Sequence, residues 1–207
     1  MRIESLKTEP DRAGRYWARL EDGSRIALYR QTIEDLGLYS GLELSDEDFM
    51  RLKEHAGAVS AKMRAVRIVA ASNVSKGDLK ARLIQKGEDP SQAADAVAWM
   101  EEMRLVDDAE TARQIVSRCA SRGYGLARAK QALYEKKIPK QYWAAALEGY
   151  PDQMEYILSF LRCRLSDESD NREVKRATDA LLRRGHSYSD VRRALSRFSI
   201  EEDFLEE

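Results

Sequence analysis

The sequence predicts a mainly helical protein: tandem three-helix repeats forming an elongated, curved solenoid, preceded by a small N-terminal β-hairpin or meander region. Three observations predict this class. Alternation of apolar and polar residues with period two is confined to the start of the chain. From residue 58 onward the apolar residues recur at helical spacing and strand signals are absent. One pattern of leucines, cations and glycines then returns twice, about 50 residues apart.

The start of the chain predicts three short antiparallel strands followed by helices. The alternating segments are residues 3–7, 15–20 and 25–29. Residues 21–24, Glu-Asp-Gly-Ser, form a tight turn signal between the second and third segments. A short helix is expected near residues 31–36. A capping box at residues 45–48 then starts a long helix that carries Phe49 and Leu52.

The repeat is defined by three leucines that are 50 and 48 residues apart. These anchor positions are Leu83, Leu133 and Leu181. Four residues before them lie Leu79, Ala129 and Ala177, and fourteen residues after them lie Val97, Leu147 and Leu195. Positions four residues apart share one face of a helix, so the anchors and their partners are predicted to pack inward.

The residue four positions after each anchor marks the expected end of a helix. Gly87 and Gly185 occupy this position in the first and third copies, where a left-handed residue is useful. Lys137 replaces the glycine in the middle copy. The sequence therefore predicts a different cap at Lys137.

Each repeat of 48–50 residues holds three expected helices. They cover residues 59–72, 75–86, 90–104, 108–122, 126–137, 139–148, 152–166, 172–185 and 187–197. A unit this small buries little core alone, so neighbouring units are expected to stack. The predicted domains are a β-rich extension with following helices at 1–57, and repeats at 58–106, 107–150 and 151–207, the last with an acidic tail.

A formal net charge of −1 conceals strong segregation of charge along the chain. Residues 111–147 carry eight basic residues against Glu135 as their one acid, a net charge of +7. Residues 172–197 carry eight basic and three acidic residues, net +5, and the tail at 198–207 is net −5. Two basic modules could serve a polyanion such as DNA or could be ordinary solvated helix faces, and charge alone leaves both open.

Several classes of function find no support in the sequence. Cys119 and Cys163 lack metal-ligand spacing and are expected to be buried thiols in a reducing cytoplasm. His55 and His186 have no carboxylate or cysteine at ligand spacing, and the adjacent acids Asp107 and Asp108 are expected to cap a helix. No signal segment, membrane-length apolar run, phosphate loop or nucleophile elbow occurs. We therefore expect a cytoplasmic protein that is not an enzyme and needs no cofactor.

Three segments resemble conserved motifs of the RecX family. Residues 75–87 (SKGDLKARLIQKG) resemble the first-repeat signature S-x-x-E-L-x-x-K-L-x-x-K-G, and residues 105–112 (LVDDAETA) resemble its L-x-D-D-x-x-[FY]-A segment. Residues 118–138 resemble the second-repeat segment that ends in E-L-x-x-K-G-I. The sequence departs from these motifs at Asp78, Thr111 and Lys137, where the family has glutamate, an aromatic residue and glycine.

The resemblance implies a regulator of the RecA recombinase in DNA repair and the SOS response. RecX proteins act on the RecA–single-stranded DNA filament, where they limit filament growth, strand exchange and ATP hydrolysis. The implied partners are the RecA nucleoprotein filament and, without sequence specificity, single-stranded DNA. No membrane partner is implied, and we expect a monomer. The alternatives are a sequence-nonspecific DNA-binding protein, perhaps with a helix–turn–helix-like pair, and a helical scaffold that binds only proteins.

The candidate contact residues are the cations of the repeats. They are Lys76, Lys80, Arg113, Arg118, Arg122, Arg128, Lys130, Lys136, Lys137, Lys140, Arg172, Lys175, Arg176, Arg183 and Arg184. Arg118 and Arg122 are one turn apart and share a helix face. Tyr124 and Tyr188 are candidates for stacking on bases. The core is expected to take Trp99, Tyr142 and Trp143.

Overall fold

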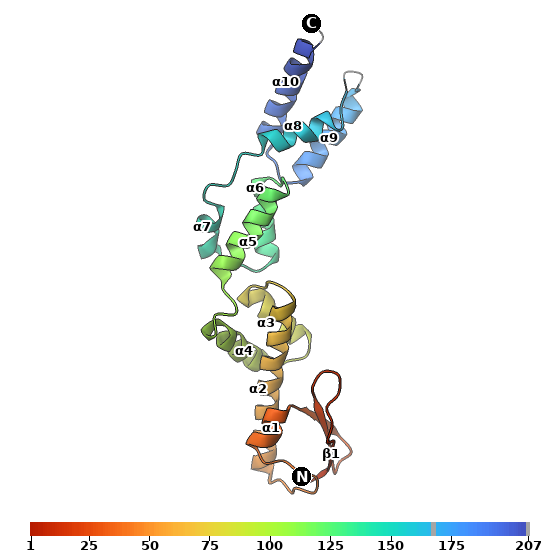
Figure 1. The fold of residues 1–207 in the computed structure, drawn as a ribbon, viewed down its shortest axis with the longest axis vertical. Coiled ribbons are helices and arrows are strands. Elements are labelled where there is room, and N and C mark those ends of the chain that lie inside the picture. The colour runs from red at the N-terminus through yellow and green to blue at the C-terminus, as the bar shows by residue number, and fades with distance from the viewer. Residues whose placement is uncertain (167–168, 206–207) are drawn as a thin grey trace. The chain divides into compact units, whose positions relative to one another are not determined.

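The computed structural model describes the backbone of residues 1–166 and 169–205 and the side chains of residues 1–166 and 169–197. Its described residues form ten α-helices, a short 3₁₀ helix and one three-stranded antiparallel sheet (Figure 1). The mainly helical class with an N-terminal meander is therefore confirmed. Two compact units make up the chain, Met1–Val106 and Asp107–Glu207, whereas the division into three repeats stays a prediction.

The sheet of the first unit is a simple meander in the order β1-β2-β3. Its strands are β1 (Ile3–Leu6), β2 (Tyr16–Leu20) and β3 (Arg25–Leu28), followed by the short helix α1 (Arg30–Asp35). Ile3 lies opposite Leu20, and both are buried. Because side chains alternate between the two faces of a strand, one face of the sheet is apolar and packs on Leu52 and Ala56.

One helix, α2 (Asp46–Ala71), serves two hydrophobic cores of the first unit. It begins after Ser45, whose hydroxyl accepts a hydrogen bond from the Asp48 amide at 3.0 Å. Its second half buries Ala61, Ala65 and Ile68 against α3 (Lys76–Gln85) and α4 (Pro90–Glu102). The prediction of a separate helix over residues 59–72 was wrong, because the same helix continues from the sheet into the next core.

The second unit is helical throughout its described residues. Its elements are α5 (Asp108–Ser121), α6 (Leu126–Glu135), η1 (Lys140–Tyr142), α7 (Trp143–Leu147), α8 (Met154–Arg162), α9 (Asn171–Arg183) and α10 (Tyr188–Leu205). The single helix expected over residues 139–148 is a 3₁₀ turn followed by the short α7. Pro139 has a ψ of 138°, an extended value, so the 3₁₀ turn can start only after it.

The inward packing predicted for the anchor positions is confirmed. Leu83, Leu133 and Leu181 have no exposed surface. Their partners one turn earlier, Leu79, Ala129 and Ala177, are also buried. Trp99, Tyr142 and Trp143 pack against the cores as partly buried side chains. Among the described helices, none combines the length and apolar character that crossing a bilayer requires.

The same cap ends all three anchor helices, so the different cap predicted for the middle copy was wrong. Gly87, Lys137 and Gly185 all have left-handed backbones, with φ of 90°, 53° and 86°. In each copy the next residue donates its amide to the anchor carbonyl: Glu88 to Leu83 at 3.1 Å, Ile138 to Leu133 at 3.0 Å, and His186 to Leu181 at 3.3 Å. This is the Schellman motif. Each donor residue is buried, so the chain must turn inward whether or not a glycine is present.

Replacing Lys137 by glycine is expected to stabilise the second unit by about 1 kcal/mol, because a left-handed backbone strains a side chain that carries a Cβ. Urea denaturation followed by circular dichroism measures the difference. The matched control is Lys136→Gly, one residue earlier, where φ is −86°. Glycine at position 136 is expected to destabilise the protein, and equal shifts for both variants would contradict the role of backbone strain.

Candidate functional site

The structure places the predicted contact cations on the surfaces of both units. On α3, Lys80 is exposed, whereas the Lys76 ammonium lies 2.7 Å from a carboxylate oxygen of Glu101. On α5, Arg113 is paired with Glu110 at 2.7 Å. An ion pair at the surface satisfies part of a cation's charge, so Lys76 and Arg113 are less available to a partner.

Arg118 and Arg122 are exposed at the end of α5. Neither forms an ion pair within the part of the chain that the structure describes. Arg118 lies in the last turn of α5 and Arg122 is its C-cap residue, and a cation is favourable at the carboxyl end of a helix. Lys130, Lys137 and Lys140 are exposed as well.

The predicted cations of the third basic segment lie along α9. Arg172, Lys175, Arg176 and Arg183 are exposed, and Arg184 is half-buried at the C-cap. Arg172 and Arg184 are separated by about 18 Å along the helix, because each helical residue advances the chain by about 1.5 Å. The set therefore does not converge on one point, and only Arg183 and Arg184 reach the feature described next.

A groove of about 530 Å³ in the second unit brings together four arginines from three segments of the chain. Its lining residues are Tyr124, Arg128, Phe160, Arg164, Ala180, Arg183 and Arg184. We call it the arginine groove. Of the four arginines, sequence reasoning missed Arg164, which lies just beyond α8 and outside both basic segments. Nothing in the local sequence distinguished Arg164 from an ordinary surface cation.

Aromatic rings hold two of these guanidinium groups in place. The Arg164 guanidinium lies 5.1 Å from the centre of the Phe160 ring, and that of Arg184 lies 5.2 Å from the same ring. Arg184 also lies 5.7 Å from the Tyr156 ring centre and donates a hydrogen bond to the Tyr156 hydroxyl. Such contacts orient a guanidinium fork before any ligand arrives.

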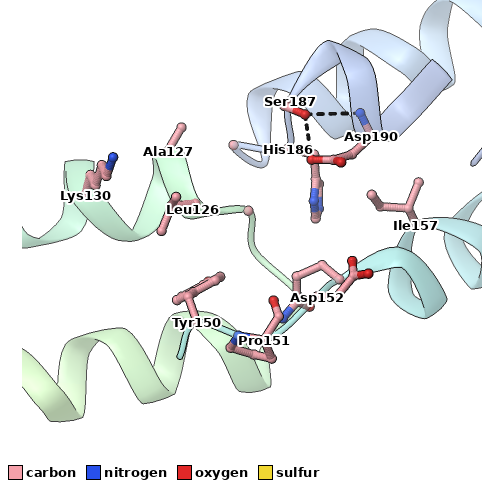
Figure 2. Close-up of a pocket in the computed structure, with 13 residues that line it drawn as sticks. Leu126, Ala127, Lys130, Tyr150, Pro151, Asp152, Ile157, His186, Ser187 and Asp190 are labelled. Carbon is pink, nitrogen blue, oxygen red and sulfur yellow. Dashed lines mark hydrogen bonds between the residues drawn. The ribbon is translucent and has the colours of Figure 1, made fainter. Parts of the chain in front are cut away.

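A second hollow, of about 410 Å³, lies beside the start of α6. Figure 2 shows the His186 ring pointing into it, between Leu126 and Ile157. His186 is 6% exposed and stacks on Tyr156 with 5.9 Å between ring centres. Its Nε2 atom is buried and has no hydrogen-bond partner among the described residues. The burial of His186 was not predicted from the sequence, because histidine is found both inside and at the surface of proteins.

Backbone hydrogen bonds around Gly125 and Gly185 join the end of α9 to the start of α6. The Gly125 amide donates to the Arg184 carbonyl at 3.0 Å, and the Ala127 amide donates to the Gly185 carbonyl at 3.2 Å. Free amides at a helix start and free carbonyls at a helix end thus satisfy one another. Residues of this turn, Arg184 and His186, line the arginine groove and the His186 hollow respectively.

Burial lowers the pKa of His186, and the nearby Arg184 charge lowers it further. The Gly123 carbonyl and the Asp190 carboxylate oppose this shift and do not cancel it. The folded state therefore binds the proton less readily than the unfolded state, where the pKa is 6.5. The stability contributed by neutral His186 is complete above pH 6.5 and is lost as pH falls from 6.5 toward the folded pKa.

At one pH unit below 6.5, we expect the free energy of unfolding of the wild type to fall by up to about 1.4 kcal/mol because of His186. The His186→Gln variant lacks the titrating group and is expected to show no such fall. Urea denaturation at several pH values measures the difference between the two proteins. His55, which lies 3.2 Å from Asp35, is present in both proteins, so the comparison isolates position 186. Parallel pH profiles would contradict a depressed pKa at His186.

The structure corrects one cysteine prediction and confirms the predicted cap. Cys119 is buried, but Cys163 is exposed at the end of α8, so the expectation of two buried thiols was wrong for Cys163. Asp107 caps α5 by accepting hydrogen bonds from the Ala109 and Glu110 amides at 2.8 and 3.0 Å. Thr111, in place of the family's aromatic residue, is buried in α5.

Comparisons with known proteins agree on one family. Curated relatives named regulatory protein RecX are 29% identical over 134 residues in Stenotrophomonas maltophilia (strain R551-3) and 28% identical over 147 residues in Leptothrix cholodnii (strain ATCC 51168 / LMG 8142 / SP-6). These matches cover 63% and 70% of this chain and 82% and 93% of the relatives. No family model matches the chain.

Solved structures show the same fold. A crystal structure of regulatory protein RecX matches with a TM-score of 0.62 at 18% identity, covering 94% of this chain and 98% of the other. The structure of RecX from Lactobacillus salivarius matches with a TM-score of 0.59 at 17% identity, covering 70% of this chain and 97% of the other. The fold therefore defines a RecX-like helical protein.

The curated relatives take the assignment one step further. The chain is thus similar to the RecX regulatory proteins in sequence as well as in fold. The curated relatives are named as regulatory proteins, and the assignment of the cations of α5, α6 and α9 as contact residues stays a prediction.

Proposed function

We propose that this protein binds RecA and the RecA–single-stranded DNA filament and mainly inhibits its recombinase and ATPase activities, in DNA repair and the SOS response. The observation that carries the proposal is the similarity to curated RecX regulators over more than four-fifths of their length. The protein is expected to act in the cytoplasm as a monomer. Hydrolysis of ATP belongs to RecA, because this sequence has no phosphate loop.

Exposed cations support a contact with a nucleoprotein filament. Arg118 and Arg122 have no ion-pair partner within the described residues, so their charge is available to an anionic surface. Cations that contact phosphates position a protein on DNA without reading its sequence. Binding is therefore expected to be independent of DNA sequence and to weaken steeply as salt rises.

The test is the rate of ATP hydrolysis by purified RecA on single-stranded DNA. Substoichiometric amounts of this protein are expected to slow hydrolysis. An unchanged rate over a wide range of concentrations would remove the proposal. Retained DNA binding would then favour a plain DNA-binding protein, and no affinity for either partner would favour a protein-binding scaffold.

Charge reversal at Arg118 and Arg122 is expected to weaken the inhibition while the circular dichroism spectrum stays unchanged. The matched control reverses two exposed cations of the first unit, Arg51 and Lys53, and gives the same change in net charge. Loss of helicity in the Arg118→Glu/Arg122→Glu variant would show that these residues are structural and would contradict their assignment as contacts.

A further inference from the structure

The arginine groove carries more positive charge than its surroundings neutralise. Four arginines line it. Among the described residues, the one carboxylate that pairs with any of these arginines is that of Glu135, 3.1 Å from the Arg128 guanidinium. Arg164 and Arg183 are exposed and form no ion pair with described residues. Like charges gathered in one hollow repel one another, and a bound anion relieves that repulsion.

The arginines of the groove are suited to a phosphate group. Arg164 and Arg184 are stacked on the same Phe160 ring, and Arg184 is fixed further by the Tyr156 hydroxyl. A guanidinium whose orientation is set in advance loses little freedom when it binds, and its planar fork matches two phosphate oxygens. Arg183, at the end of the adjacent helix α9, adds an unpaired cation to the same hollow.

Tyr124 adds a ring to this cationic surface. It is half-buried, it lines the groove, and its hydroxyl makes no hydrogen bond to any described residue. Its backbone is fixed on both sides: the Tyr124 amide donates to the Cys119 carbonyl at 3.0 Å, and its carbonyl accepts from the Tyr150 hydroxyl at 2.7 Å. A ring on a fixed backbone next to phosphate-binding cations is the arrangement with which proteins stack unpaired bases.

We propose that the arginine groove binds one nucleotide step of single-stranded nucleic acid, with the phosphate on Arg164 and Arg183 and the base stacked on Tyr124. The groove volume of about 530 Å³ lies within the range that small ligands occupy in proteins. A duplex keeps its bases stacked inside the helix and can offer only its phosphates. The groove therefore selects single strands over duplexes. This inference rests on the proposed function, which supplies the single-stranded DNA of the RecA filament as the ligand, but binding to the groove is tested directly.

The experiment measures fluorescence anisotropy of a labelled oligothymidine strand, and of a duplex of equal length, at several salt concentrations. Wild type is expected to bind the single strand more tightly. Arg164→Glu/Arg183→Glu is expected to lower single-strand affinity by about tenfold or more and to reduce the slope of log affinity against log salt by about 1.4. The control is again Arg51→Glu/Lys53→Glu, with the same net charge and no groove residue changed.

Variants of Tyr124 test the stacking separately. Tyr124→Ala is expected to lower single-strand affinity between about fivefold and a hundredfold, whereas Tyr124→Phe keeps the ring and the affinity. Binding to a strand of the same length made of abasic phosphodiester units is expected to be insensitive to Tyr124→Ala. A Tyr124→Ala variant with wild-type affinity for oligothymidine would overturn the assignment of the base.

The groove is excluded as the site if its charge-reversed variant matches the control, or if duplex and single strand bind equally. These outcomes are distinguishable from failure of the proposed function. Wild type that binds oligothymidine through the groove and leaves RecA hydrolysis unchanged would uphold the groove and remove the regulator. If wild type inhibits RecA, but the groove variant and the control variant bind the strand equally well, the regulator proposal would stand and the groove proposal would be removed.

Discussion

Alanine at position 125 is expected to destabilise the second unit by about 3 to 5 kcal/mol. A Cβ on Gly125 would overlap the Gly185 carbonyl and the His186 amide, which are backbone atoms and cannot swing aside as side chains do. Relief requires α6 and the α9–α10 turn to separate, which breaks the hydrogen bonds from Gly125 to Arg184 and from Ala127 to Gly185. Urea denaturation measures the loss, and amide hydrogen exchange shows which helices open.

The matched control is the same substitution at Gly57, inside α2. The atoms nearest to a Cβ there are those at the end of the Gln92 side chain, which can rotate away. Alanine favours the helix interior by up to about 1 kcal/mol over glycine, so Gly57→Ala is expected to be neutral or stabilising. A mild effect of Gly125→Ala, similar to that of Gly57→Ala, would contradict the close backbone packing at the α6–α9 junction.

Leu133→Ala is expected to destabilise the second unit by about 2 to 5 kcal/mol. Leu133 has no exposed surface and packs with Ala112, Val116 and Ile138. Removing its side chain loses the transfer free energy of the apolar atoms and leaves a cavity. The free energy of unfolding from urea denaturation tests this expectation, and a shift near zero would refute the role of the anchor leucine in the core.

The neighbouring residue supplies the control for this prediction. Tyr134 is 72% exposed and is larger than leucine. Its replacement by alanine removes more atoms from the protein and few from the core, so the expected change in stability is small. A Tyr134→Ala variant that destabilises as much as Leu133→Ala would show that the helix itself, and not the buried position, is sensitive to substitution.

The candidate site was only partly predictable from the sequence. Local charge density pointed to Arg128, Arg183 and Arg184, because each lies in a segment rich in basic residues. Arg164 follows an apolar helix and lies outside those segments, so nothing local distinguished it from a solvated surface cation. The groove is assembled from α6, α9 and the end of α8, and its lining residues Tyr124 and Arg184 are 60 residues apart in the chain. No periodic pattern in the sequence predicts that residues so far apart lie together.

The cap at Lys137 shows a second limit of sequence reasoning. A glycine predicts a left-handed residue because it lacks a Cβ, and its replacement by lysine therefore indicated a different turn. The buried residue that follows, Ile138, requires the same turn in all three copies. Burial of one side chain outweighed the local strain of another, and only the tertiary structure reveals which residue is buried.

The helical class, the strands of the meander and the inward faces of the anchor helices were predictable from the sequence. These features depend on periodicity and capping, which are local and repeat along the chain. The tertiary structure alone decided that one helix joins the sheet to the next core, that glycine backbones hold α6 against α9, and that four arginines share a groove. Those features depend on contacts between distant segments, whose geometry is set by the packing of side chains in three dimensions.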